Sequence, residues 1–512
     1  MFQRLLSVGG FTLLSRITGF GRDILMAWII GPGILSDAFI VAFMFPNYFR
    51  SIFGEGAINP AFLPRYAALQ ARSEADKAAL FADQIFSWQM LAQVAILIGG
   101  LFAMPLIVRV LAPGFAANPA QMALTISLAR ITFPYLILTL VAIQLSAMLN
   151  AIDRFWAAAA WSNFQNLGMI ATLICWRWFP NAAYAAAWGV LLGGVVQLFF
   201  MLWAAKRESL DLHIVWPRWT AEVKEFFAAL GAVTLGTATT LIAPMIDTVL
   251  ASFLATGSRT ALYYGDRINQ LPLGVLGIAL GTVLLPQMSA RLAQNDRTGS
   301  DAAQNNAAAL TLLLTLPFAA VFVAIPDAIM TGIFAHGAFN AHAAAQAATA
   351  LAAYGVGLPA MALVRIFAST FYARHDTATP ARVTFIAFGA NIAMKLVLVW
   401  GLNMGVAGIA LGTAFGAWLN VGQLIWLGRR RKLLVVDDRL KRAILPTILA
   451  AVGAGAGAYA GIYLTAHVGG TPWLKDLVRL AAAGGLGTVL YLAVVVLFRR
   501  MLPLGRLVRS GS

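Results

Sequence analysis

Charged residues and cysteine are both scarce in this sequence. Only 11% of the 512 residues are charged, and Cys175 is the one cysteine. A single cysteine excludes an intramolecular disulfide, and we expect its thiol to lie buried among apolar side chains. So few charges in so long a chain indicate that much of its surface meets lipid rather than water.

Residue patterns that bind nucleotides or metals are also missing. No P-loop pattern occurs. Asp437 and Asp438 are the only adjacent carboxylates and lie in a basic loop, whereas a lipid phosphotransferase would need a carboxylate cluster for magnesium. Five histidines lie in or near predicted loops without metal-ligand spacing: His213, His336, His342, His375 and His467. We therefore expect neither an enzyme, nor a cofactor, nor a metal site.

Long apolar runs dominate the sequence instead. Hydrophobic residues make up 60% of the chain, and runs of the roughly 20 residues that a membrane helix needs recur throughout it. The runs are too long for barrel strands and lack two-residue alternation, so we expect an all-α polytopic membrane protein with fourteen transmembrane helices. The first run has no small-residue cleavage site and should stay in the protein. The predicted spans lie near 4–31, 35–66 (bent), 82–110, 121–150, 155–178, 183–205, 222–254, 262–290, 303–326, 345–373, 378–400, 405–428, 441–465 and 475–499.

The basic residues predict the orientation of these spans. Two thirds of the 36 Lys and Arg residues fall in loops on the side of the N-terminus. The opposite loops hold four: Arg109, Arg177, Arg259 and Lys475. The positive-inside rule therefore places both termini in the cytoplasm. Basic loops beside anionic lipid account for most of the net charge of +16, so no nucleic-acid partner is expected. We interpret the basic run at 428–442 as a topology signal rather than a binding site.

Eight cations remain inside the predicted spans. They are Arg16, Arg22, Arg50, Arg130, Arg267, Arg365, Lys395 and Arg479. Each costs at least about 2.5–3.5 kcal/mol at the bilayer centre, so each needs a partner, a watery cavity or a route to the surface. Two roles are equally open for three of them, which could be structural anchors or could extend their side chains to the membrane surface: Arg130, Arg365 and Arg479.

Two interpretations of Arg16 and Arg22 stay open. Arg16 lies about 20 Å along the first helix, too deep to reach the surface. Asp23 follows seven residues later on the same helical face, and a buried Arg16–Asp23 pair could fix helix packing. The alternative is a cavity that receives an anion, beside Gly19 and Gly21, which permit bending or the close approach of a neighbour.

The sequence also resembles itself. Three pairs of segments match at offsets of 222 to 224: 22–33 with 246–257, 149–159 with 371–381, and 187–197 with 410–420. Six helices separate the copies, an even number, so the lobes share one orientation and are related by an axis along the membrane normal. We expect an N-terminal lobe (1–210), a C-terminal lobe (211–432) and two further helices with a basic C-terminus (433–512). Two such lobes would face each other across a central cavity and give alternating access by rocking.

Arginines from both predicted lobes would line that cavity. Arg16, Arg22 and Arg50 belong to the first lobe and Arg267 to the second. Guanidinium suits phosphate because it offers forked donors and a charge that burial does not remove. Four arginines would suit a diphosphate.

Several motifs together resemble the MurJ (MviN) family of lipid II flippases. They are SRITGFGRD (15–23), SDAFIVAFMFPNYFR (36–50), FGEGAINPAFLP (53–64), APGF (112–115), YYGDRINQLPLGVLGIALGT (263–282) and FYARHDTATP (371–380). The resemblance spans nearly the whole chain and implies a superfamily that includes multidrug and polysaccharide-lipid exporters. It implies that lipid II, an undecaprenyl-diphosphate disaccharide-peptide, is carried from the inner to the outer leaflet of the bacterial inner membrane, with membrane lipids as the other partners.

The resemblance also assigns roles to residues. The family's substrate-binding arginines fall on Arg16, Arg22, Arg50 and Arg267, and its gate residues on Asp37, Glu55 and Ser258. We further expect supporting ion pairs at Asp23, Asp266, Asp247 and Lys395. From the residues alone, Glu55 could instead be a solvated carboxylate in a turn, and Asp37 could be the N-cap of the second helix.

A sodium site in the second lobe is thought to exist in some members of this family. Asp247 is present here, but Asn391 is followed four residues later by Lys395, on the same helical face. A lysine can take the place of a cation and pair with Asp247. We therefore expect no sodium site in this chain.

Other functions fit parts of the same pattern. An exporter of another polyprenyl-diphosphate glycan would need the same charges, whereas a cation-coupled multidrug exporter would want acidic and aromatic walls. A scaffold without transport gives no reason for buried arginines.

An inside-negative potential favours anion export by about 2.3 kcal/mol per charge per 100 mV, so no ATP site is needed. The lipid tail is expected to stay in the bilayer beside the last two helices, and the oligomeric state is left open.

Overall fold

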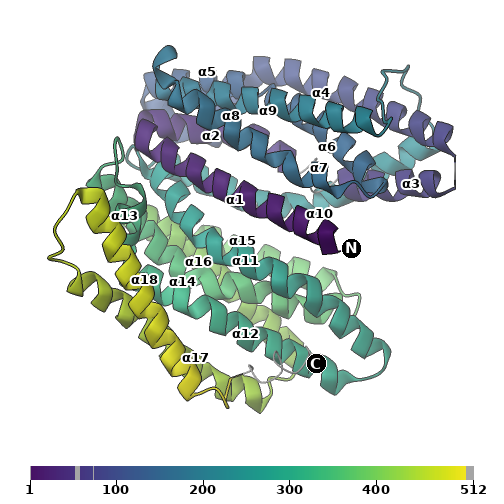
Figure 1. The fold of residues 1–512 in the computed structure, drawn as a ribbon. Helices are drawn as coiled ribbons and strands as arrows, with labels where there is room; N and C mark the ends of the chain where they lie inside the picture. Colours follow the sequence, from purple (N-terminus) through teal and green to yellow (C-terminus); the bar gives the residue numbers. More distant parts are fainter. Residues whose placement is uncertain (1, 52–57, 73, 503–512) are drawn as a thin grey trace. The chain divides into compact units, whose positions relative to one another are not determined.

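The computed structural model describes residues 2–51, 58–72 and 74–502, with side chains except at 2–8, 59, 232–233, 235–241 and 275–283. These residues form helices and connecting loops, and no strand occurs among them (Figure 1). The first ten α-helices are α1 (Phe2–Ile30), α2 (Ile34–Phe49), α3 (Asn59–Ala71), α4 (Ala75–Leu111), α5 (Pro119–Thr132), α6 (Tyr135–Ala151), α7 (Phe155–Ala160), α8 (Ser162–Ile174), α9 (Ala182–Arg207) and α10 (Ala221–Ser252). The next eight are α11 (Ser258–Ala293), α12 (Arg297–Ala324), α13 (Pro326–Phe334), α14 (Ala341–Tyr372), α15 (Ala378–Leu396), α16 (Gly405–Arg430), α17 (Asp438–Leu464) and α18 (Pro472–Leu497).

The helices agree with the predicted spans. Each span coincides with one helix or with two consecutive ones, such as α5 and α6, which meet at Pro134. Nine helices in the described part of the chain are long and apolar enough to cross a membrane. The chain is therefore an all-α polytopic membrane protein, as predicted. Helix α13 is absent from the predicted spans because its 9 residues are too few to cross a bilayer.

Packing divides the chain into two compact units. The first holds Met1–Gly257 and Gly337–Phe339, and the second holds Ser258–His336 and Asn340–Ser512. In the second unit α17 packs against both α12 and α18. The predicted lobes follow the sequence copies, whereas these units follow contacts, and the two divisions differ at α10.

Backbone geometry repeats at the offsets found in the sequence. Asp153 and His375, 222 residues apart, both adopt left-handed φ, 62° and 59°. In both places the next residue donates its N–H to the carbonyl five residues earlier. Arg154 N donates to Leu149 O (2.9 Å), and Asp376 N donates to Phe371 O (3.0 Å). The two helices therefore end in the same left-handed cap.

Two further pairs of left-handed residues obey the same offsets. Ser209 and Lys432, 223 residues apart, follow α9 and α16 with φ of 56° each. Gly33 (φ 134°) and Gly257 (φ 93°), 224 residues apart, directly precede α2 and α11. Matched caps at matched helix ends extend the internal duplication from sequence to backbone.

Matched glycines also permit matched helix contacts. On α9, an added Cβ at Gly193 would lie 2.6 Å from Gln165 Cα of α8. On α16, an added Cβ at Gly416 would lie 2.8 Å from Asn391 Cβ of α15. Small residues at these positions let each pair of helices approach closely, as is usual between membrane helices.

Side chains of α4 form hydrogen bonds with the backbone of the segment between α9 and α10, and so hold this segment along α4. Asp83 Oδ1 accepts from His213 N (2.8 Å), and Ser87 Oγ accepts from Val215 N (2.9 Å). Gln84 binds the same segment twice, because its Nε2 donates to Trp216 O and its Oε1 accepts from Arg218 N. Because these buried side chains hold the chain that leads into α10, α10 packs with the first unit although its sequence begins the second copy.

Removing two of these acceptors should loosen the segment. In Asp83→Ala/Ser87→Ala, we expect trypsin to cleave the detergent-solubilised protein after Arg218 at least about tenfold faster, because each lost bond contributes roughly 0.5–3 kcal/mol against local opening. Asp76→Ala is the matched control, since it removes an exposed carboxylate from the same helix. Equal cleavage rates in all three proteins would mean that these bonds do not hold the segment.

Cys175 differs from the prediction. Its thiol is free and partly exposed rather than buried. The residue is the C-cap of α8, and the turn that follows exposes Trp176 and Trp178. A position in a helix-ending turn explains why the thiol lies outside the apolar interior.

Candidate functional site

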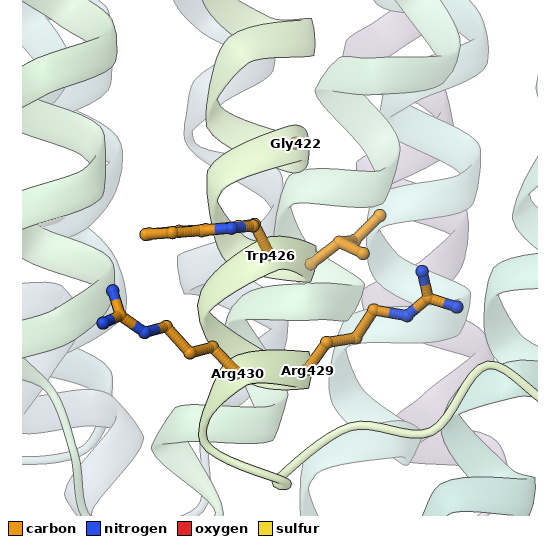
Figure 2. Close-up of a pocket in the computed structure, with 5 residues that line it drawn as sticks. Gly422, Trp426, Arg429 and Arg430 are labelled. Carbon is orange, nitrogen blue, oxygen red and sulfur yellow. The ribbon is translucent and has the colours of Figure 1, made fainter.

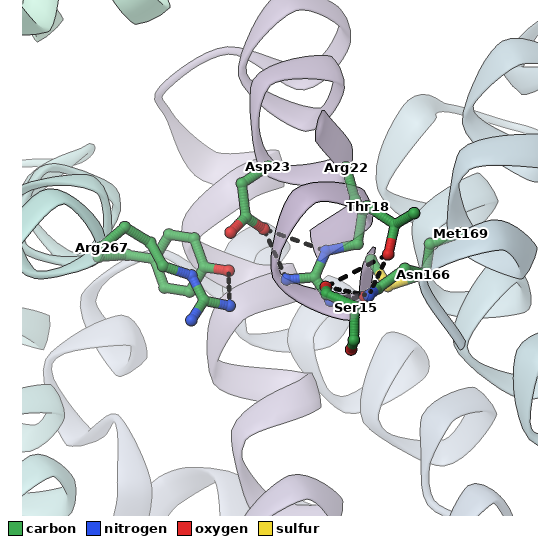
Figure 3. A network of polar contacts seen from close by, with 8 residues as sticks. Ser15, Thr18, Arg22, Asp23, Asn166, Met169 and Arg267 are labelled. Carbon is green, nitrogen blue, oxygen red and sulfur yellow. Dashed lines mark hydrogen bonds and ion pairs between the residues drawn. The ribbon is translucent and has the colours of Figure 1, made fainter. Parts of the chain in front are cut away.

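A polar seam joins α1 to α8 within the first unit. Ser15, Thr18 and Arg22 follow one face of α1 at helical spacing and meet Ser162 and Asn166 of α8. Ser162 Oγ lies 3.0 Å from Ser15 Oγ. Asn166 Nδ2 donates to Ser15 O and Thr18 Oγ1, each at 3.2 Å (Figure 3). Hydrogen bonds between membrane helices contribute about 0.6 kcal/mol each on average, so the seam fixes the register of α1 modestly but at several points.

Arg22 is the charged member of this seam. Its Nε and Nη2 donate to Asp23 Oδ1 at 3.0 and 2.6 Å, and its Nη1 donates to Asn166 Oδ1 at 3.1 Å (Figure 3). Arg22 is 6% exposed and Asp23 only 1%. A charge-assisted pair and an amide from another helix therefore fix the plane of the guanidinium.

Asp23 pairs with Arg22 and not with Arg16, which removes the open alternative of a buried Arg16–Asp23 pair. The two residues share a helical face, but the side chain of the adjacent Arg22 bends back to Asp23 and takes its Oδ1. Arg16 is exposed on α1 and makes no ion pair in the part of the chain that the structure describes. Gly19 lies between them in sequence, and an added Cβ there would lie 3.4 Å from Asn166 Nδ2, so α8 can approach α1 at this point.

Arg50 and Arg267 contact neutral side chains. Arg50, the C-cap of α2, is half-buried and donates from Nε and Nη2 to Asn47 Oδ1, at 3.3 and 3.2 Å. Arg267 of α11, in the second unit, donates to Tyr263 OH (3.2 Å), and its Cζ lies 5.3 Å from the centre of that ring. These contacts help to orient the two guanidinium groups.

Asp37 lies in the first turn of α2 and is 2% exposed. Its Oδ2 accepts from Gly257 N at 2.7 Å, so it holds the chain directly before α11. The N-cap of α2 is Gly33, which excludes the alternative role of Asp37 as that cap. Of the other predicted gate residues, Ser258 is the buried first residue of α11, and Glu55 lies outside the described residues.

The predicted pair of Asp247 and Lys395 divides between the two units, and it stays a prediction. Asp247 lies half-buried on α10. Lys395 is 1% exposed on α15, and its stem packs against Gly412 of α16, where an added Cβ would lie 2.3 Å from Lys395 Cγ. The glycine therefore makes room for the lysine.

Asp266, expected in a supporting ion pair, accepts from the side-chain amide of Gln270 one turn further along α11. Among the residues with described positions, no three His, Cys, Asp or Glu side chains gather as metal ligands.

The sequence interpretation missed the uncharged half of the site. Asn166 binds both Arg22 and α1, and Ser162 and Asn163 continue the seam. Three polar residues at helical spacing inside the predicted span 155–178 were a readable signal. A search restricted to charged residues passes over them because amides cost far less than cations in a membrane helix.

Fold and site together define a polytopic helical membrane protein with cations fixed inside its helices. The family model described as Lipid II flippase MurJ matches residues 26–474. A probable lipid II flippase MurJ from Rhizobium tropici is 36% identical over 97% of this chain and 93% of its own. A lipid II flippase MurJ from Burkholderia cenocepacia is 31% identical over 84% of each chain.

Solved structures agree at the level of the fold. A lipid II flippase MurJ in an inward closed conformation matches with a TM-score of 0.78 over 96% of this chain and 99% of its own, at 23% identity. An inward-facing MATE family multidrug resistance transporter matches with a TM-score of 0.69 over 83% and 97%, at 15% identity. The chain belongs to the lipid II flippase MurJ family, which confirms the resemblance noted in its sequence.

Proposed function

We propose that this protein moves lipid II from the inner to the outer leaflet of the bacterial cytoplasmic membrane. The observation that carries the proposal is family membership over nearly the whole chain, with relatives named as lipid II flippases. The site adds a chemical reason, because Arg22 is buried in a membrane helix with its guanidinium held in one plane. A fixed fork of donors suits the phosphates of a lipid diphosphate.

In this proposal the arginines hold the diphosphate while the two lobes alternate in access. Arg16, Arg50 and Arg267 supply guanidinium groups from α1, α2 and α11, and Arg22 supplies an oriented fork. The disaccharide-peptide head occupies the cavity, and the polyprenyl tail stays in lipid beside α17 and α18. Asp37 and Glu55 act as gates on the two sides, with Ser258 beside Asp37.

No bond of the substrate is broken in this process, so the protein works as a transporter without a catalytic centre or a cofactor. Its helices cross the inner membrane several times, with both termini in the cytoplasm, as the basic loops predict. The membrane potential drives export of the anionic head.

We further propose that Lys395 takes the place of a sodium ion in this chain. Lys395 is buried on α15 one turn after Asn391, and its ammonium would supply a fixed positive charge where a bound cation would otherwise be needed. Transport should then proceed at the same rate in sodium-free and sodium-containing buffers. Dependence of transport on sodium would exclude this role.

Complementation tests the proposed function. Cells depleted of their own lipid II flippase should grow when they express the wild-type chain, and should lyse with Arg16→Ala, Arg50→Ala or Arg267→Ala at equal membrane levels. Arg109→Ala is the matched control, because Arg109 is an exposed arginine in the last turn of α4. Failure of a well-expressed wild type would point to another lipid-linked glycan, and rescue by all variants would return these arginines to a structural role.

A further inference from the structure

A shallow groove of about 510 Å³ lies on one face of α16, in the second unit. It is lined by residues at helical spacing: Gly422, Ile425, Trp426, Arg429 and Arg430. An added Cβ at Gly422 would meet nothing within 4 Å, and Trp426 is 57% exposed. The groove is thus apolar and open towards the end with Gly422, and basic towards the end of the helix (Figure 2).

The two arginines of the groove lack acidic partners. Neither Arg429 nor Arg430 forms an ion pair or a hydrogen bond through its side chain within the described ranges, and Arg430 Cζ lies 5.3 Å from the centre of the Trp426 ring. Their side chains extend to opposite sides of the helix end (Figure 2). The next residue, Arg431, does have an acidic partner, since its Nη1 donates to Asp376 Oδ2 at 3.1 Å and to Thr379 Oγ1 at 2.9 Å.

The backbone that carries these arginines is fixed. Bonds from Thr379, more than the nearby Arg431, keep the pKa of Asp376 below its usual range, so the carboxylate is charged at neutral pH and holds the end of α16. The chain then turns back, with Leu433 N donating to Gly428 O at 2.8 Å. Asn305 Nδ2 binds the carbonyl of the returning chain, at Val435 (2.7 Å). The groove therefore lies on a helix end whose position does not depend on a ligand.

The positive-inside rule and the helix dipole both favour basic residues at this end, but they do not require an apolar recess and an exposed tryptophan in line with two arginines. We infer that the groove binds an anionic glycerophospholipid of the surrounding leaflet. Its phosphate lies at the basic end of the groove, which Arg429 and Arg430 line, and its acyl chain follows the recess at Gly422 beside Trp426. The apolar half of the groove selects a lipid over a free anion, and the guanidinium forks select a phosphate.

Lipid titration of the purified full-length protein tests this inference. Phosphatidylglycerol should raise the melting temperature of the protein in detergent. In Arg429→Gln/Arg430→Gln, the lipid concentration that gives half of this shift should rise about tenfold or more, because each basic residue near a membrane surface contributes about a factor of five in affinity. Arg439→Gln/Arg442→Gln is the matched control, because it removes two exposed charges from the same basic run outside the groove. Gly422→Leu, which fills the recess and keeps both charges, should weaken the response as well.

Three results would overturn the inference. Equal weakening in the groove variant and the Arg439/Arg442 variant would indicate a general basic surface. The same shift with phosphatidylcholine would exclude selection of an anionic lipid, and the same shift with inorganic phosphate would identify a site for a free anion.

Discussion

Arg22→Ala is expected to abolish rescue of flippase-depleted cells and to lower the stability of the protein. Asp23, 1% exposed, would lose the guanidinium that lies 2.6 Å away and stay buried. Removing one partner of a buried pair costs about 3–5 kcal/mol, more than the other site arginines would cost. Melting curves in detergent and complementation at equal membrane levels measure the two effects.

Loss of stability alone would leave the role of Arg22 undecided, because a packing arginine would also destabilise the protein when removed. Arg22→Gln/Asp23→Asn separates the two roles. The pair of amides keeps hydrogen bonding to Asn166 and removes both charges of the pair together, so the melting temperature should return close to that of the wild type. If the guanidinium binds the diphosphate, this stable variant still fails to rescue.

Rescue by the double variant would assign Arg22 to packing and remove it from the proposed binding site. Arg16→Ala should affect transport without affecting stability, because Arg16 is exposed and unpaired in the described part of the chain. We expect that variant to keep its melting temperature and to lose transport.

The helices were predictable because a bilayer demands long apolar runs, and glycine, proline and charge mark where the runs end. The division of the chain into two units was not predictable from the sequence. Helix α10 belongs to the second copy by sequence, yet side chains of α4 hold the segment before it, and hydrogen bonds to a loop backbone leave no periodic signal. The duplication was readable in only three short segments, whereas the structure repeats it at helix caps, where φ is conserved although Asp153 and His375 differ in type.

The candidate site was predictable to the extent that it is charged. Cations in apolar spans stand out, so Arg22 and Arg267 could be found, but their partners could not. Helical spacing left Arg16 as one possible partner of Asp23, whereas the structure pairs Asp23 with the adjacent Arg22. Asn166 comes from a helix 144 residues away in sequence, and only packing brings it to Arg22.

Gly193→Ala should destabilise the protein by about 1–3 kcal/mol, the usual cost of overpacking, and Gly193→Leu should prevent its accumulation. An added Cβ at this position lies 2.6 Å from Gln165 Cα and 3.0 Å from Gln165 O, so α8 and α9 must separate, and no side chain can swing away to relieve the contact. If the duplication governs packing, Gly416→Ala should cost a similar amount in the second copy, where the Cβ would lie 2.8 Å from Asn391 Cβ.

Gly99→Ala is the matched control, because it makes the same substitution in a membrane helix where an added Cβ meets nothing within 4 Å. There the change should leave stability unchanged or raise it by up to about 1 kcal/mol, since alanine restricts the unfolded chain more than glycine does. The melting temperature in detergent should therefore fall for Gly193→Ala and stay the same or rise for Gly99→Ala. A fall of equal size at both positions would trace the effect to the substitution itself, and the close contact of α8 with α9 would lose its role in holding the first copy together.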